Sequence, residues 1–201
     1  MLIMKKNEEA FTGLEAAIVL IAFVVVAAVF SFVVLGAGFF TTQKSHEVVY
    51  AGVGSAASNM VVKGDVYGIS TTTPTEIIYI QFDVGLAAGG YPIDAAKLTM
   101  IYSDTTNTPR HLLYQPQTGW DTSLVDPDPG NWTMINKAGS DTSNDDDVLK
   151  YGQTFTIRTY PLADMIPPRE AFHIEIKPEI GASIAISRTV PPSLKATTLL
   201  T

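Results

Sequence analysis

The chain has 201 residues, of which 13 are basic and 20 acidic, for a net charge of -7, and it contains no cysteine. This acidic balance argues against a protein that follows nucleic-acid phosphates, which needs a basic stripe. The lack of cysteine excludes a disulfide scaffold, a thiolate metal site and a cysteine nucleophile. Apolar residues are concentrated in the first sixty positions, and the remaining ~140 residues are enough for one ordinary domain.

A run of 25 residues, from 16 to 40, contains no charged side chain. As an α-helix it is about 37 Å long, which exceeds the ~30 Å hydrocarbon core of a bilayer. Lys5 and Lys6 precede the run and only Lys44 closely follows it, so the positive-inside rule places the N-terminus in the cytoplasm. A secretory signal peptide has an apolar region of only roughly 7–15 residues. The run is therefore expected to span the membrane.

The helical pattern continues beyond this run. Apolar residues recur at near-helical spacing through residues 48–61 with polar residues between them, which is typical of an amphipathic helix. A single helix over residues 13–62 is about 75 Å long. Its apolar stripe needs a partner, and neighbouring copies of the chain are the simplest candidate. Four glycines either permit close approach of backbones or merely soften the helix; they are Gly36, Gly38, Gly52 and Gly54.

The start of the helix carries a capping motif. Thr12 and Glu15 have the spacing of a capping box, with Thr12 as the N-cap and Glu15 at the third helical position. Such a cap stabilises a helix by roughly 1 kcal/mol. Glu15 is also an isolated acid at the head of an apolar segment, where an unpaired carboxylate is costly to bury. A buried Glu15 therefore needs a partner.

Residues 9–15, with the sequence Glu-Ala-Phe-Thr-Gly-Leu-Glu, resemble the class III signal-peptide junction of type IV pilins and archaeal flagellins (archaellins). The resemblance implies that a membrane-embedded prepilin-type signal peptidase cuts between Ala10 and Phe11. Residues 1–10 are then a leader, and residues 11–63 stay in the mature protein as the helical filament core. The free amine of Phe11 can neutralise Glu15 of the same or a neighbouring subunit and so set the axial register. The leader departs from the archaellin pattern, because Glu8 and Glu9 stand where basic residues are usual.

After residue 64 the periodicity changes from helical to alternating. Strands are expected at residues 76–82, 97–103, 111–115, 154–160, 172–177 and 183–188, with Gly, Pro, Asn and Asp between them. Residues 64–201 therefore read as an antiparallel β-sandwich of immunoglobulin-like architecture, and the whole chain as an α+β protein. Residues 43–68 and 186–194 are also similar to the helix end and the closing strand of archaellins. In that family the β-domains sheathe a helical core, and a membrane motor rotates the filament.

A polar insertion over residues 121–147 holds seven aspartates, at positions 121, 126, 128, 141, 145, 146 and 147. Asn131 begins the N-glycosylation sequon Asn-Trp-Thr, so an N-glycan is expected there. Residues 144–147 could bind a hard cation through carboxylate oxygens, but they lack the pattern of an EF-hand. A solvated acidic loop is the simpler interpretation, and no metal site is expected.

No catalytic constellation emerges. His46 and Glu47 begin like a zinc-protease motif, but Tyr50 stands where the second histidine is required. His111 and His173, without a cysteine, cannot make a blue-copper site. No enzyme activity, cofactor or nucleic-acid partner is expected.

The resemblance instead implies a structural subunit of the archaellum. Such a subunit is inserted in the membrane as a precursor and polymerises with itself outside the archaeal cell, with the help of an assembly platform and motor in the membrane. Two alternatives stay open. One is an adhesion pilin of a non-rotating pilus, and the other is an uncleaved, membrane-anchored β-domain that binds a partner.

Overall fold

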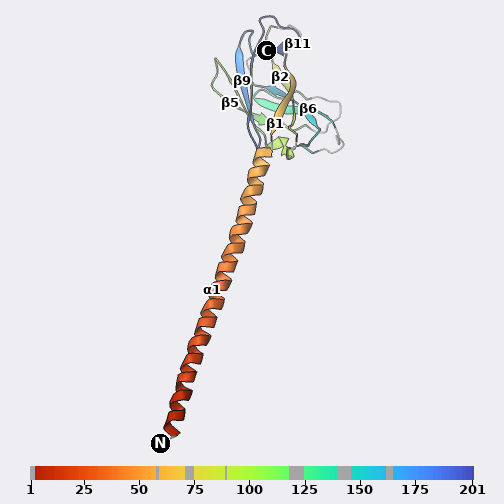
Figure 1. The fold of residues 1–201 in the computed structure, drawn as a ribbon. Helices are drawn as coiled ribbons and strands as arrows, with labels where there is room; N and C mark the ends of the chain where they lie inside the picture. Colours follow the sequence, from red (N-terminus) through yellow and green to blue (C-terminus); the bar gives the residue numbers. More distant parts are fainter. Residues whose placement is uncertain are drawn as a thin grey trace. The chain divides into compact units, whose positions relative to one another are not determined.

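The N-terminal part of the chain forms one helix, α1, over Ile3–Ala57. In the computed structural model (Figure 1) the described residues are 3–57, 59–70, 75–88, 90–117, 125–139, 146–161 and 165–201, and the side chains of residues 3–11, 55 and 57 are not described. No proline precedes residue 74, so nothing interrupts the hydrogen bonding of a helix about 80 Å long. The chain divides into two compact units, Met1–Ala51 and Gly52–Thr201, each of which is described by itself.

The expected end of the helix near residue 62 was wrong, and in this uncleaved chain the helix also includes part of the expected leader. The helix begins at Ile3, within the expected leader, and it stops at Ala57, whereas Met60–Ile69 forms strand β1. Met60 and Val66 are buried in the β-domain core. Over such a short segment, the apolar pattern of a strand and that of a helix are hard to tell apart. Burial of these residues against the sheet decides in favour of the strand.

Among the described residues that follow β1, the chain forms ten further strands and one 3-10 turn. They are β2 (Tyr79–Leu86), β3 (Ile93–Asp94), η1 (Ala95–Lys97), β4 (Thr99–Asp104), β5 (Arg110–Tyr114), β6 (Asn131–Ala138), β7 (Val148–Leu149), β8 (Thr154–Tyr160), β9 (Ala171–Lys177), β10 (Ile184–Thr189) and β11 (Thr197–Leu200). Every expected strand overlaps an observed one. Five observed strands had no counterpart among the expectations: β1, β3, β6, β7 and β11.

Nine strands form a sheet in the order β10-β9-β4-β5-β6-β8-β2-β1-β11, and β3 pairs with β7. All neighbouring pairs are antiparallel except β5 and β6, which run parallel over two residue pairs. The inner faces of the four strands before this joint and the five after it contribute to one hydrophobic core. The expected α+β class, a long apolar helix followed by a mostly antiparallel β-domain, is confirmed.

Strand β6 corrects the interpretation of residues 121–147 as one polar insertion. Trp132, Thr133 and Met134 are consecutive and all buried, because Trp132 and Met134 enter the core while Thr133, on the other face, is covered by Gln115 and Gln117, to which it is hydrogen-bonded. A strand buried on both faces shows no period of two, so its sequence does not stand out from the polar residues around it.

The C-terminal residues dock on the sheet as strand β11. Val66 of β1 pairs with Leu200, and Ile69 pairs with Thr197. Beyond the strand, the Thr189 N–H donates to the Thr201 carbonyl oxygen at 2.7 Å. Leu200 is 2% exposed, whereas its neighbour Leu199 is 46% exposed on the opposite face. The tail is thus part of the core.

Replacing Leu200 with alanine should lower the free energy of unfolding by about 2–5 kcal/mol, since the substitution leaves a cavity in the core. The matched control, Leu199→Ala, should cost much less because that side chain is already half in solvent. Urea unfolding of the full chain in detergent, followed by tryptophan fluorescence, measures both. Equal losses for the two variants would contradict the docking of the tail.

Candidate assembly surface

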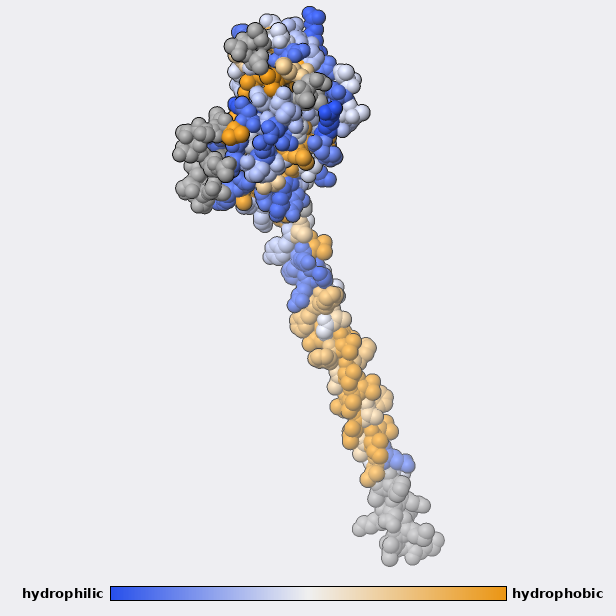
Figure 2. All heavy atoms as spheres, turned by 180° about the vertical axis from the view of Figure 1, so that it is seen from behind, coloured by the Kyte–Doolittle hydropathy of each residue, from blue (hydrophilic) through white to orange (hydrophobic). Residues whose placement is uncertain are grey.

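Helix α1 has no apolar neighbour along its described surface. Every residue from 12 to 53 is exposed, and Figure 2 shows a nearly continuous apolar surface over much of this helix. The large exposed side chains include Ile18, Phe23, Val29, Phe32 and Phe40. Burying each such side chain is worth about 1.5–3 kcal/mol, so a helix carrying this many must be covered by lipid or by protein.

A polar band follows the apolar run of α1. The hydroxyls of Thr41 and Thr42 donate to the carbonyl oxygens four residues before them, at 2.8 and 2.9 Å. The Lys44 ammonium pairs with the Glu47 carboxylate at 2.6 Å. By length and composition the segment Thr12–Gly54 meets the requirements of a membrane span. The Lys44–Glu47 ion pair thus marks the point after the charge-free run where the surface of the helix is no longer apolar all round.

The expected processing junction lies within α1. Ala10 and Phe11 are helical, and their side chains are not described. Thr12 and Glu15 are exposed in the interior of the helix, so Thr12 is not an N-cap in this uncleaved chain. The cap and the register role both require a helix that starts near Phe11, and both stay predictions for the cleaved protein.

Asn131 opens strand β6 and is half-buried. Its side-chain amide donates to the Gln115 side-chain oxygen at 3.3 Å. The sequon hydroxyl, on Thr133, is fully buried and donates to the Gln115 backbone oxygen at 2.7 Å. An enzyme that reads this hydroxyl cannot reach it in the folded domain, so a glycan on Asn131 would have to be attached before β6 pairs. Glycosylation of Asn131 stays a prediction.

Within the described part of the acidic segment, three of the four aspartates pair through their carboxylates with other side chains, and the fourth, Asp128, is exposed. Asp126 pairs with Arg158, and the Asp147 carboxylate accepts from the Tyr114 hydroxyl at 2.8 Å. Asp146 accepts from Lys150 at 3.0 Å and from Lys137 at 3.2 Å. No group of three metal-ligating side chains occurs among the described residues; Asp121, Asp141 and Asp145 lie outside them.

The three histidines are dispersed. His46 stacks on Tyr50, with ring centroids 6.4 Å apart on the exposed helix. His173 contacts the Ser187 hydroxyl through Nδ1 at 2.8 Å, on β9 and β10. His111 lies exposed on β5, and Ile101 of β4 pairs with it. The three histidines therefore lie at separate places in the described part of the chain and do not form a cluster.

This apolar helix and its β-domain match one family. A family model for archaeal-type flagellin covers residues 10–188. "Probable flagellin 1" of Archaeoglobus fulgidus is 39% identical over 203 aligned residues, which span 97% of this chain and 96% of that protein. The chain belongs to the archaeal-type flagellins. A second relative, "Probable flagellin 2" of the same organism, is 35% identical over 94% of this chain and 93% of its own length.

Two solved flagellin structures share the fold. The archaeal flagellum of Methanospirillum hungatei strain JF1 has a TM-score of 0.71 and 31% identity, covering 94% of this flagellin and 99% of that chain. The flagellin FlaB1 of Methanocaldococcus jannaschii has a TM-score of 0.58 and 21% identity, covering 72% and 97% of the two chains. The first match includes the long helix and the β-domain in one chain. This flagellin therefore belongs to a structural family.

The Asp146 ion pairs should make the stability of this flagellin depend on pH. Hydrogen bonds from Lys150 and then Lys137 hold the pKa of the Asp146 carboxyl below its usual value. The folded chain then binds that proton less readily than the unfolded chain, so the pairing stabilises the fold above about pH 4 and is lost as the pH falls through the lowered pKa.

Asp146→Asn should therefore lower the Tm at pH 7, and the difference from the parent chain should shrink as the pH falls below about 4. The control Asp65→Asn replaces an exposed aspartate and should leave the Tm unchanged at pH 7 and at the lower pH. Circular dichroism melts across this pH range provide the measurement. A constant difference for Asp146→Asn at every pH would contradict the assignment.

Proposed function

We propose that this flagellin is a structural subunit of the archaellum, an extracellular filament that rotates for swimming. The single observation that carries the proposal is the fully exposed apolar surface of α1 in a chain that matches a subunit of an archaeal flagellum over almost its whole length. In the membrane, lipid covers this surface. Outside it, only other copies of the same helix offer an apolar surface of equal length.

The transfer from lipid to filament sets a requirement on packing. Lipid tails are as apolar as valine or leucine, so the hydrophobic effect alone does not favour leaving the membrane. Close contact between helices must supply the difference through dispersion, which individual atom pairs provide only at about 3.5–4.0 Å. Added Cβ atoms at Gly36 and Gly38 would meet nothing within 4 Å, so both positions are open to a neighbouring backbone.

Removal of residues 1–10 would change the start of the helix. Thr12 and Glu15, now in its interior, would become first-turn residues, where a threonine cap and an acidic side chain are favoured by free N–H groups and the helix dipole. The new amine of Phe11 would lie within about one turn of Glu15 and could neutralise it. In this proposal a prepilin-type peptidase prepares the subunit, and the assembly platform and motor in the membrane receive it. No catalytic step by this flagellin is part of the proposal.

Val29 lies on α1 within the charge-free run. Val29→Asp should abolish filaments, because an aspartate in an apolar helix costs about 2.5–3.5 kcal/mol on insertion and has no partner in a helical bundle. Val29→Leu keeps the apolar surface and should assemble. Electron microscopy of sheared filaments gives the result, and membrane fractionation separates failed insertion from failed assembly. Normal filaments from Val29→Asp would refute packing through this helix.

Processing and modification are tested on the same sheared filaments. Intact mass and N-terminal sequencing should show a chain that begins at Phe11, with any excess mass located on Asn131. The Asn131→Gln variant removes the acceptor and is the control for that mass. A chain that begins at Met1 and stays in the membrane fraction would favour an anchored β-domain. Swimming of a strain that lacks the protein would tell a rotating filament from a static pilus, since only the former should be needed for motility.

A further inference from the structure

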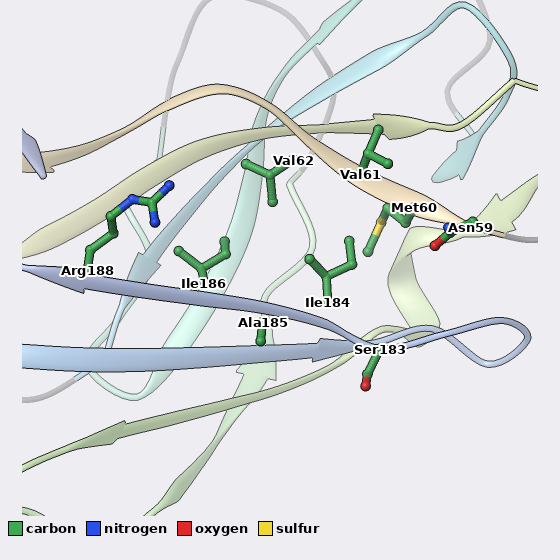
Figure 3. Close-up of a pocket in the computed structure, with 9 residues that line it drawn as sticks. All are labelled: Asn59, Met60, Val61, Val62, Ser183, Ile184, Ala185, Ile186 and Arg188. Carbon is green, nitrogen blue, oxygen red and sulfur yellow. The ribbon is translucent and has the colours of Figure 1, made fainter. Parts of the chain in front are cut away.

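A groove of about 380 Å3 lies on the β-domain where strand β1 starts beside the edge strand β10 (Figure 3). Residues 59–62 line one side and residues 183–186 with Arg188 line the other. Strand β10 is at the end of the sheet and pairs only with β9. One side of the groove is therefore a free sheet edge.

The groove is open because β11 covers only part of β1. Strand β11 pairs with β1 between Val66 and Ile69, and the chain end reaches Thr189 of β10. Gly64, with φ of 76°, lies where the register of β1 shifts, between Lys63 and Tyr67. Before this irregularity β1 pairs with β2 alone, so its start is left uncovered on the side of β10.

The space between the two strands is filled by apolar side chains. Figure 3 shows Val62, Ile184 and Ile186 directed into it, close to Met60. Met60 and Ile186 are buried, whereas Val62 and Ile184 are half-buried. An inserted strand would have to displace these side chains, so the groove is better suited to an apolar cover than to pairing with a further strand.

We propose that the second half of α1 from a neighbouring copy covers this groove, through the stripe formed by Val48, Val49, Gly52 and Val53. These four residues share one face of the helix. The three valines are 55–69% exposed, and a Cβ added at Gly52 would meet nothing within 4 Å. The stripe thus combines three apolar side chains with a glycine, where a neighbouring copy can approach the helix backbone closely.

Chain continuity favours this occupant. Asn59, at the mouth of the groove, follows the last helical residue, Ala57, by two positions, which is about 7 Å of chain at most. In a polymer held together by α1, each groove is therefore joined by a short piece of chain to the end of a packed helix, and the second half of a neighbouring copy's helix is available to cover it. Val48 to Val53 spans about 7.5 Å of helix, and Ile184 to Arg188 about 13 Å of strand, so the stripe fits within the groove. The inference rests on the proposed function, because it needs a filament.

The test uses the absence of cysteine from the chain. The double variant Val49→Cys with Val62→Cys is oxidised in assembled filaments and run on a non-reducing gel. A ladder of cross-linked subunits is expected, because each disulfide would join two different copies. The matched control combines Val49→Cys with Val61→Cys, whose side chain is also half-buried but is directed to the other face of β1 (Figure 3). It should give mainly monomer.

A second measurement does not depend on disulfide geometry. Maleimide should label Val62→Cys in detergent-dispersed subunits and label it at least ten times more slowly in filaments. Monomer only from Val49→Cys with Val62→Cys, equal ladders from the two pairs, or protection of Val62→Cys without a ladder would each overturn the assignment of the helix stripe. Absence of filaments from the parent chain would refute the proposed function instead, so the two failures are distinguishable.

Discussion

A helix that is apolar around its whole circumference cannot remain in water, and most other features of this flagellin follow from that constraint. The charge-free run of α1 is long enough to cross a bilayer, and every described side chain along it is exposed. A soluble amphipathic helix hides one stripe against its own domain. Here the whole helix surface is left for something outside the subunit, first lipid and then, in the proposed filament, other helices.

The β-domain has the opposite character, because it buries its apolar residues in a core of its own and has no cysteine with which to form disulfides. Its core takes side chains from both groups of strands, including Trp132, Tyr102 and Phe155. Acidic residues that a sequence alone would leave in solvent are paired with buried or half-buried cations, above all Lys137, whose side chain is 2% exposed.

The free sheet edges show how the domain limits unwanted pairing. Strand β11 closes part of the gap between β1 and β10, and the Thr189 N–H donates a hydrogen bond to the backbone oxygen of Thr201. The remaining opening is filled by isoleucine and valine side chains, which prevents the entry of a further strand. A sheet edge covered by apolar side chains can still present an apolar surface to a helix. In the proposed filament, these side chains would thus allow contact between copies while preventing the pairing of one sheet with another.

The sequence determined the elements whose pattern is local. The charge-free run predicts α1, and strict alternation predicts β9, because a helix and a half-buried strand each impose a period on their own residues. The tertiary structure decided the rest. Met60 became the start of a strand only through burial in the core, β6 lost its alternation because both of its faces are covered, and Leu200 is a core residue only because the tail lies along β1. These outcomes depend on contacts between segments far apart in the chain, which no local period records.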